Sequence, residues 1–218
     1  DINESYENFT VAGGKIRFGL GAIKNVGINA VKNIVESRKQ GSFNSLFDFC
    51  RRVDLAHINK RMIENLIVAG CFDSLDITRK QTLSIMDECI ELAMQIKQSQ
   101  SSGQLSLFGD VSSMVEEPRP RVKGELESRD LLNREKEVLG FYVSANPLDE
   151  YRDLLPLLTT CSVADLQGNL NDTYVRVAGT VINLSRRVSR RGDSYARFIL
   201  EDLSGRMEVM VFPSAYRR

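Results

Sequence analysis

The chain has 218 residues, of which 42% are hydrophobic, enough for one large domain or two small domains with a linker. Its 29 Lys and Arg residues balance 29 Asp and Glu residues, and no apolar run approaches the ~20 residues of a membrane-spanning helix, so we expect a cytoplasmic protein with no membrane partner. The polar start at Asp1 is unlike a secretory signal, and we expect this chain to be cut from a longer polypeptide.

The few cysteine and histidine residues argue against a metal site. A zinc site needs about four clustered nitrogen or sulfur ligands. The chain has no CxxC pair, and its candidate ligands are His57, Cys50, Cys71, Cys89 and Cys161. We therefore expect no metal or other cofactor in this chain, no catalytic residue, and four reduced, mostly buried thiols.

In chain order, the residue pattern of the first half of the sequence predicts a hairpin followed by helices. Residues 8–20 form two short apolar runs around Gly13-Gly14, a pattern typical of paired strands. Asn59 is a typical N-cap, and Gly70 is a typical glycine at a helix end. Helical spacing of apolar residues predicts helices over about 28–38, 45–52, 60–69 and 78–98.

The second half changes from helix to strand. Gln, Ser, Gly, Pro and charged residues dominate 98–127, a composition typical of a flexible linker. Helical spacing returns at 129–143 and at about 148–155. A period of two then predicts strands over 174–182, 195–200 and 207–212.

The balanced net charge conceals two basic stretches. Residues 14–61 carry ten Lys and Arg against three Asp and Glu, and residues 174–218 carry nine against four. Two basic stretches separated by acidic ones indicate two surfaces for a polyanion, although charged faces are often only solvated.

An internal repeat with an offset of 32 residues covers the first basic stretch. In each copy, a tight turn leads into a helix with apolar residues at 3.6 spacing. The matching positions are Ile23 and Leu55, Val26 and Ile58, Gly27 and Asn59, Val31 and Ile63, Ile34 and Leu66, and Val35 and Ile67.

A tight turn at a helix N-terminus directs free N–H groups outward, and the helix dipole adds to their attraction for a phosphate. We expect Gly27 and Asn59 to open the two helices, because both residue types tolerate left-handed backbone angles. Such a site would bind the backbone of duplex DNA with little sequence preference. The predicted DNA-binding residues here are Lys24, Asn25, Val26, Gly27, Lys32, Asn59, Lys60 and Arg61.

This repeat resembles the tandem helix-hairpin-helix DNA-binding module. Residues 23–27, followed by Ala30 and Ile34, carry the likeness in the first copy. Asn25 stands where that family usually has glycine, and the second copy departs further. We therefore expect the first hairpin to contact phosphate and the second to act mainly as its packing partner. A helix pair with no DNA role is the alternative.

One apolar peptide lies in the predicted linker, where no core is available to bury it. It consists of Gln104, Leu105, Ser106, Leu107 and Phe108. The pattern resembles the peptide with which bacterial replication proteins bind the sliding clamp, the beta subunit. The resemblance implies that Leu107 and Phe108 fill a hydrophobic pocket of the clamp, helped by Leu105, and that Gln104 forms hydrogen bonds beside it.

The three strands near the C-terminus resemble the first strands of an OB-fold, a barrel of five strands. Gly179 fits the bend that such barrels require. A mixture of cations and aromatic rings is typical of single-stranded DNA binding, whereas a solvated hairpin tip is the alternative. The candidate residues are Arg186, Arg187, Arg190 and Arg191 in the first connection, with Tyr195 and Phe198 after it.

Several runs together resemble the alpha subunits of bacterial DNA polymerase III, the C-family replicative polymerases. They follow that family's order over nearly the whole chain, with one departure at Ala145-Asn146, where Gly-His is usual. The runs are 16–27, 45–50, 59–61, 69–73, 104–108, 139–142 and 147–151.

The resemblance implies an α+β, multidomain chain whose catalytic palm, with its magnesium ions, lies upstream of Asp1. It implies duplex DNA, the sliding clamp and other replicase subunits as partners, with single-stranded DNA for the OB part. The implied domains are the end of the fingers (1–20), a tandem helix-hairpin-helix domain (21–98), a linker with the clamp-binding peptide (99–128), a helical connector (129–160) and the N-terminal part of a truncated OB-fold domain (161–218).

Two other functions stay open on the sequence. Helix-hairpin-helix and OB parts also occur in accessory modules of DNA repair enzymes such as ligases and nucleases. Such a module would bind DNA without binding the clamp. A scaffold with no DNA affinity is the third hypothesis.

Overall fold

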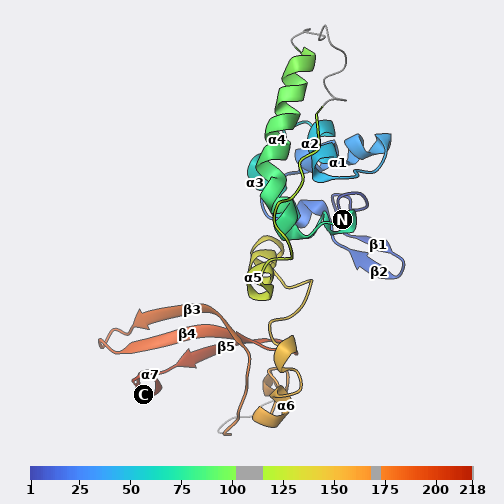
Figure 1. Cartoon of the computed structure of the whole chain (residues 1–218). Helices are drawn as coiled ribbons and strands as arrows, with labels where there is room; N and C mark the ends of the chain where they lie inside the picture. Colours follow the sequence, from blue (N-terminus) through green and yellow to red (C-terminus); the bar gives the residue numbers. More distant parts are fainter. Residues whose placement is uncertain (102–114, 168–172, 218) are drawn as a thin grey trace. The chain divides into compact units, whose positions relative to one another are not determined.

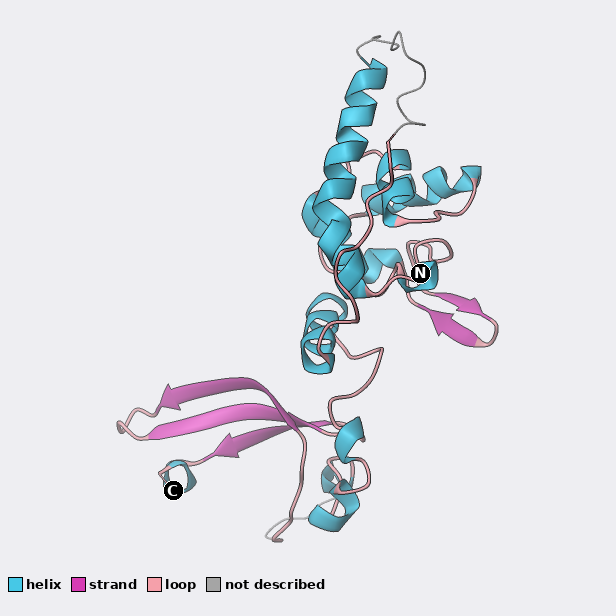
Figure 2. Ribbon diagram, viewed as in Figure 1, coloured by secondary structure: helices cyan, strands magenta, loops and turns pink. Residues whose placement is uncertain are grey.

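The computed structural model describes residues 1–101, 115–167 and 173–217, and it has the predicted α+β class. The chain divides into two compact units, Asp1–Val143 and Ser144–Arg218. Helices dominate the first unit, and a three-stranded sheet dominates the second (Figure 1, Figure 2). The five-part division predicted from the sequence stays a prediction.

The first unit, here called the helical unit, begins with the predicted hairpin, in which Val11 pairs with Ile16. Its helices follow in the order expected from the apolar spacing. The elements are β1 (Thr10–Ala12), β2 (Lys15–Arg17), α1 (Ile28–Ser37), α2 (Leu46–Arg52), α3 (Lys60–Val68), α4 (Arg79–Ser101) and α5 (Ser128–Leu139).

Local side-chain chemistry sets several helix ends. Asn59 is the N-cap of α3, as predicted, and its Oδ1 accepts a hydrogen bond from the Met62 N–H at 2.9 Å. Gly70 has a φ of +75° just beyond α3, and a side chain there would collide with the guanidinium of Arg79. Helix α5 ends four residues before the predicted position 143, because Gly140 adopts a left-handed φ of +87°.

Both copies of the repeat bury their apolar residues in one core. Helix α4 packs against α2 and α3. The Phe49 ring lies edge-on to Phe43 and to Phe72, with ring centroids 5.2 Å apart in each pair. The completely buried positions of the repeat include Ile34, Ile63 and Leu66.

Three of the cysteines, Cys50, Cys71 and Cys89, are buried parts of the core. All four are free thiols, and three are buried. Burial raises the pKa of Cys50 and of Cys89 to about 12, and that of Cys71 to about 11. These thiols therefore stay protonated and unreactive at neutral pH, as expected from the sequence.

Residues 115–126, within the predicted linker, pack against the helices of the helical unit. Val115 is partly buried against the main core. The Glu125 carboxylate accepts the backbone N–H groups of Arg79 and Lys80, each at 2.9 Å, and so caps the N-terminus of α4. Partial burial opposes the charge of Glu125, but its backbone hydrogen bonds lower its pKa overall.

A buried ion pair joins α5 to the rest of the helical unit. Arg79 is 7% exposed and Glu135 is 0% exposed, and Arg79 Nη1 lies 3.1 Å from Glu135 Oε1. Arg79 also donates to the Val68 carbonyl at 2.9 Å and to Asp73 Oδ2 at 2.7 Å. Burial opposes the charge of Arg79, yet the hydrogen bonds to Asp73 and Glu135 raise its pKa. One guanidinium thus links α3, α4 and α5.

We predict that Glu135→Ala lowers the free energy of unfolding by about 3 kcal/mol, because it leaves a buried guanidinium without one partner. Urea denaturation measures this change. Glu137→Ala is the control, since Glu137 lies exposed on the same helix, and its loss should cost less than about 1 kcal/mol. Equal effects of the two substitutions would contradict a structural role for the buried pair.

The second unit, here called the strand unit, has an antiparallel sheet in the order β3-β4-β5. Thr180 pairs with Glu201, and Phe198 pairs with Val209. This arrangement fits the start of an OB-fold, which itself stays a prediction. The elements are α6 (Leu155–Leu158), β3 (Thr180–Val188), β4 (Ser194–Glu201), β5 (Arg206–Val211) and α7 (Pro213–Tyr216).

The first predicted strand of this unit was wrong in position. It was expected over 174–182, whereas β3 starts at Thr180 and continues to Val188. A tight turn, closed by the Ser189 N–H and the Asp193 carbonyl at 2.8 Å, lets pairing continue almost to the hairpin tip. Gly179 lies just before β3, where an added Cβ would approach the Glu201 carbonyl oxygen to 2.6 Å. The close approach of the two chains there requires glycine.

The helix predicted over 148–155 is also wrong in detail. The chain forms a 3-10 turn at Asp149–Tyr151 and then the short α6. Pro156 lies in the first turn of α6, where proline is tolerated but cannot extend a preceding helix.

Candidate nucleic-acid interface

The first hairpin of the repeat is a tight turn with an exposed tip. The Val26 N–H donates to the Ile23 carbonyl at 3.0 Å. Ile23 and Val26 are 4% and 7% exposed, whereas Lys24 and Asn25 are exposed between them. The two apolar side chains therefore anchor the turn in the core and leave its tip in solvent.

The left-handed residue of this hairpin is Asn25, with a φ of +65°. The expectation that Gly27 and Asn59 would use such angles was wrong, since their φ values are −81° and −85°. Both are N-caps, and an N-cap residue normally has extended backbone angles. A positive φ at the third turn position is typical of a type II turn, which favours glycine or asparagine there. This explains the presence of Asn25 where the helix-hairpin-helix family usually has glycine.

The N-terminus of α1 is open to an anion. Its N-cap, Gly27, offers no side-chain oxygen to the first-turn N–H groups, and no acidic residue occurs in that turn. An added Cβ on Gly27 would meet nothing within 4 Å, so packing does not require glycine here. Lys32 lies one turn further along α1 and lines a surface hollow with Tyr6 and Val35.

Helices α3 and α5 hold the first hairpin from behind. The Lys24 N–H donates to the Val138 carbonyl of α5 at 2.9 Å, and Asn65 of α3 donates to the Lys24 carbonyl at 2.5 Å. The Lys24 ammonium lies 3.3 Å from the Glu137 carboxylate, and both side chains are largely exposed. A phosphate would therefore compete with Glu137 for Lys24.

The second hairpin offers a poorer anion site. Its turn closes between the His57 N–H and the Asp54 carbonyl at 3.1 Å. The Asn59 side chain already occupies the α3 N-terminus. Lys60 lies 2.7 Å from Asp87, and this hydrogen bond is the main reason that the Lys60 pKa is raised. Arg61 is exposed beside it. The two hairpins therefore differ in how open their helix N-termini are, and the phosphate contact of the first stays a prediction.

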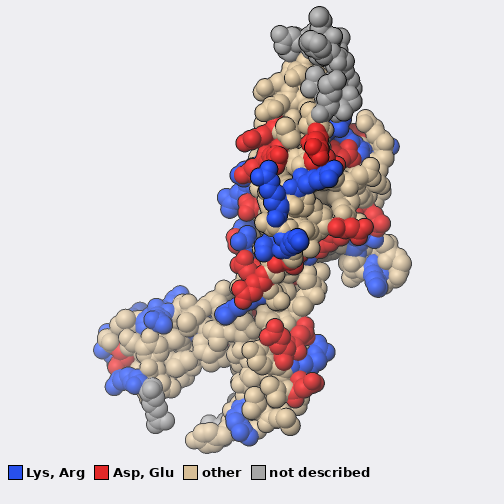
Figure 3. All heavy atoms as spheres, viewed as in Figure 1, with Lys and Arg blue, Asp and Glu red and all other residues tan. Residues whose placement is uncertain are grey.

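Acidic and basic side chains alternate over the face of the helical unit visible in Figure 3. Lys24 and Lys60 are each paired with an acidic residue, Glu137 and Asp87. The basic stretch of the sequence therefore does not fold into an uninterrupted basic surface on that face, and local geometry decides which cations are available.

The sheet of the strand unit separates the four predicted arginines. Arg187 lies opposite Tyr195, and Ser185 lies opposite Arg197, so these four share one face of the sheet. Alternation places Arg186 on the other face. The remaining two, Arg190 and Arg191, lie at the turn between β3 and β4.

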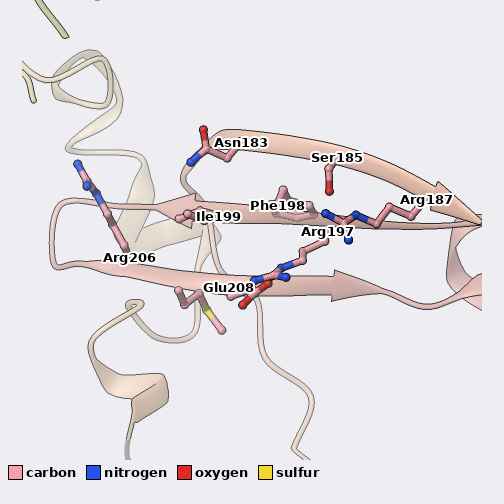
Figure 4. A pocket seen from close by; sticks show the side chains of 9 residues that line it. Asn183, Ser185, Arg187, Arg197, Phe198, Ile199, Arg206 and Glu208 are labelled. Atoms are coloured by element: carbon pink, nitrogen blue, oxygen red, sulfur yellow. The ribbon is translucent and has the colours of Figure 1, made fainter. Parts of the chain in front are cut away.

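Arg197 and Arg206 were missed as candidates. Both line a hollow of about 470 Å³ together with Arg187 (Figure 4). Arg206 donates to Glu201 at 2.8 Å and 2.9 Å, and Arg197 pairs with Glu208. In a strand every second residue faces the same way, so the positions of Tyr195, Arg197 and Ile199 in the sequence were the signal for this face.

The predicted clamp-binding residues Gln104–Phe108 lie outside the described residues. Within the described ranges, no group of His, Cys, Asp and Glu side chains could hold a metal ion. Each helix in those ranges is too short or too polar to cross a membrane.

The helix-hairpin-helix motif family matches residues 1–82, a range that includes both turns of the repeat. DNA polymerase III subunit alpha of Mycobacterium tuberculosis is 38% identical over 224 residues, covering 99% of this chain. The same subunit of Vibrio cholerae is 38% identical over 223 residues, covering 100% of this chain. The chain is homologous to DNA polymerase III subunit alpha.

The resemblance seen in the sequence is thereby confirmed, as is the helix-hairpin-helix motif. The chain spans about a fifth of the curated relatives it matches, 19% in both of these cases. The match to DNA polymerase III subunit alpha covers both the helical unit and the strand unit. It favours the polymerase hypothesis over the repair-enzyme and scaffold hypotheses.

Proposed function

We propose that this chain is the DNA-binding and clamp-binding part of a replicative DNA polymerase, and that its first hairpin holds the phosphate backbone of duplex DNA. The observation that carries the proposal is the open N-terminus of α1, directly behind the exposed turn at Lys24 and Asn25. Free N–H groups and the helix dipole attract one phosphate there, and Lys24 adds a positive charge.

Backbone contacts of this kind give affinity without sequence specificity. That suits a polymerase, which must pass over every sequence. Each neutralised phosphate releases counterions, so the logarithm of the affinity falls with the logarithm of the salt concentration by about 0.9 per contact. The salt slope therefore counts the contacts, and its change in a variant shows whether the substituted residue makes one of them.

We predict that Lys24→Glu weakens binding to a labelled duplex oligonucleotide and reduces the salt slope by about one. Fluorescence anisotropy at several salt concentrations measures both quantities. Lys60→Glu is the matched control, because Lys60 occupies the second hairpin and is already paired with Asp87, so its effect should be smaller. An unchanged slope in Lys24→Glu would remove the first hairpin as the phosphate site.

One face of the sheet, which carries Arg187, Tyr195 and Arg197 and is here called the polar face, is the candidate surface for single-stranded DNA. Arg187 and Arg197 provide cations, and Tyr195 shares their face. Cations that follow the backbone and an aromatic ring that stacks on a base are the usual means of binding a single strand. Glu208 and Glu201 pair with Arg197 and Arg206, so a strand bound here would have to compete with both carboxylates.

We predict that Arg187→Ala weakens binding to an oligothymidine strand and lowers its salt slope by about 0.7, the value for one phosphate of a single strand. Arg186→Ala is the control, since Arg186 is the adjacent residue on the opposite face, and it should change the slope less. If both variants behave alike, the polar face is not the binding surface.

Residues 104–108 are proposed to bind the sliding clamp. The support is the sequence pattern and its position between Ser101, the last residue of α4, and Val115, which packs on the same unit. Burial of Leu107 and Phe108 would provide about 2–3 kcal/mol each, less the cost of ordering the peptide. A roughly micromolar contact results, and attachment to DNA would raise its effective strength.

We predict that the full chain is retained by immobilised sliding clamp and that the double substitution Leu107→Ala and Phe108→Ala abolishes retention, because it removes both apolar anchors. Surface plasmon resonance provides the measurement. The double substitution Leu154→Ala and Leu157→Ala is the control, because it removes exposed apolar side chains elsewhere. Retention of the 107 and 108 double mutant at wild-type strength would reject the clamp assignment.

The catalytic palm of the whole polymerase, with magnesium, would lie outside this sequence. No residue of the chain matches the metal-binding aspartate motif of such a palm. This part would therefore bind and position DNA while another part joins nucleotides to a primer end. The other replicase subunits are further expected partners.

A further inference from the structure

Each copy of the repeat has an asparagine at the same position, and each asparagine reaches the hairpin of the other copy. Asn33 of α1 and Asn65 of α3 are separated by the repeat offset of 32 residues. Asn65 Nδ2 donates to the Lys24 carbonyl of the first hairpin at 2.5 Å. Asn33 Oδ1 accepts the N–H of Asp54, the first residue of the second turn, at 2.8 Å. The two contacts are reciprocal.

We propose that Asn65 is a positioning residue that orients the first hairpin for phosphate, an inference that rests on the proposed duplex-binding function. The Lys24 carbonyl belongs to the peptide between Lys24 and Asn25. In a planar trans peptide the C=O and N–H groups point in opposite directions. Asn65 is 8% exposed, so it draws the carbonyl inward and thereby directs the Asn25 N–H outward.

The same contact fixes the type of turn. Rotation of the central peptide would convert a type II turn into a type I turn, in which the third residue has a negative φ. The observed φ of +65° at Asn25 belongs to the first of these forms. The hydrogen bond from Asn65 stabilises it and holds the outward N–H beside the open N-terminus of α1. A hairpin free to rotate would lose one donor to the phosphate.

The two asparagines differ in the group that they use, which gives a sharp test. Asn65 acts as a donor and Asn33 as an acceptor. A carboxylate accepts hydrogen bonds but does not donate them. Asn33→Asp therefore keeps its contact, whereas Asn65→Asp loses its contact and places a negative charge against a carbonyl oxygen. Both substitutions add the same charge to the same module.

The experiment compares the two variants in the full 218-residue chain, with a labelled duplex oligonucleotide titrated at several salt concentrations. Asn65→Asp should weaken binding about tenfold and reduce the salt slope by about 0.9, the value of one phosphate contact. Asn33→Asp should stay within about twofold of the wild type with an unchanged slope. Loss of stability alone would leave the slope of the folded molecules unchanged.

Asn65→Ala covers the case in which Asn65→Asp does not fold, because it removes the donor without burying a charge. Circular dichroism identifies the temperature range in which it is folded, and the same loss of slope is expected there. An unchanged slope in folded Asn65→Ala, or equal losses for Asn33→Asp and Asn65→Asp, would overturn the positioning role. Absence of salt-dependent duplex binding by the wild type would instead overturn the proposed function itself, and the positioning role with it.

Discussion

The buried contact between Arg79 and Glu135 is the interaction on which the helical unit depends. A charge in a protein interior is stable only when its partners are complete, and Arg79 has partners from three directions: Glu135 of α5, Asp73 and the Val68 carbonyl at the end of α3. The pair fixes α5 in place, and α5 in turn supplies the Val138 carbonyl that binds the Lys24 N–H. The geometry of the exposed hairpin is thus connected to an ion pair in the core.

The repeat shows how two similar sequences acquire different roles. Both copies bury their apolar positions in one core, and both present a turn at a helix N-terminus. Gly27 leaves the first N-terminus uncovered, whereas Asn59 occupies the second with its own side chain. A one-residue difference in N-cap chemistry therefore separates a surface suited to an external anion from one that satisfies itself.

The strand unit distributes its charge by a different rule. Side chains of successive residues point to opposite faces of a sheet, so neighbouring arginines are separated and distant ones meet. Arg187, Arg197 and Arg206 share a hollow on one face (Figure 4). Glu201 and Glu208 lie on the same face and moderate its charge. Because two of these arginines are already paired, binding of a polyanion there would be weaker than the number of arginines suggests.

The sequence by itself determined the α+β class, the hairpin at 8–20, the positions of most helices, the N-cap at Asn59, the helix-hairpin-helix motif and the polymerase family. These features depend on local periodicity, on residue types with distinct backbone preferences, or on short sequence runs that resemble those of a known family. Only the tertiary structure decided that Asn25 and not Gly27 is left-handed, that β3 continues through Arg187, and that residues 115–126 pack on the helical unit. It also decided that Asn65 and Val138 hold the first hairpin. Each of these depends on partners distant in sequence, whose hydrogen bonds and packing no local pattern records.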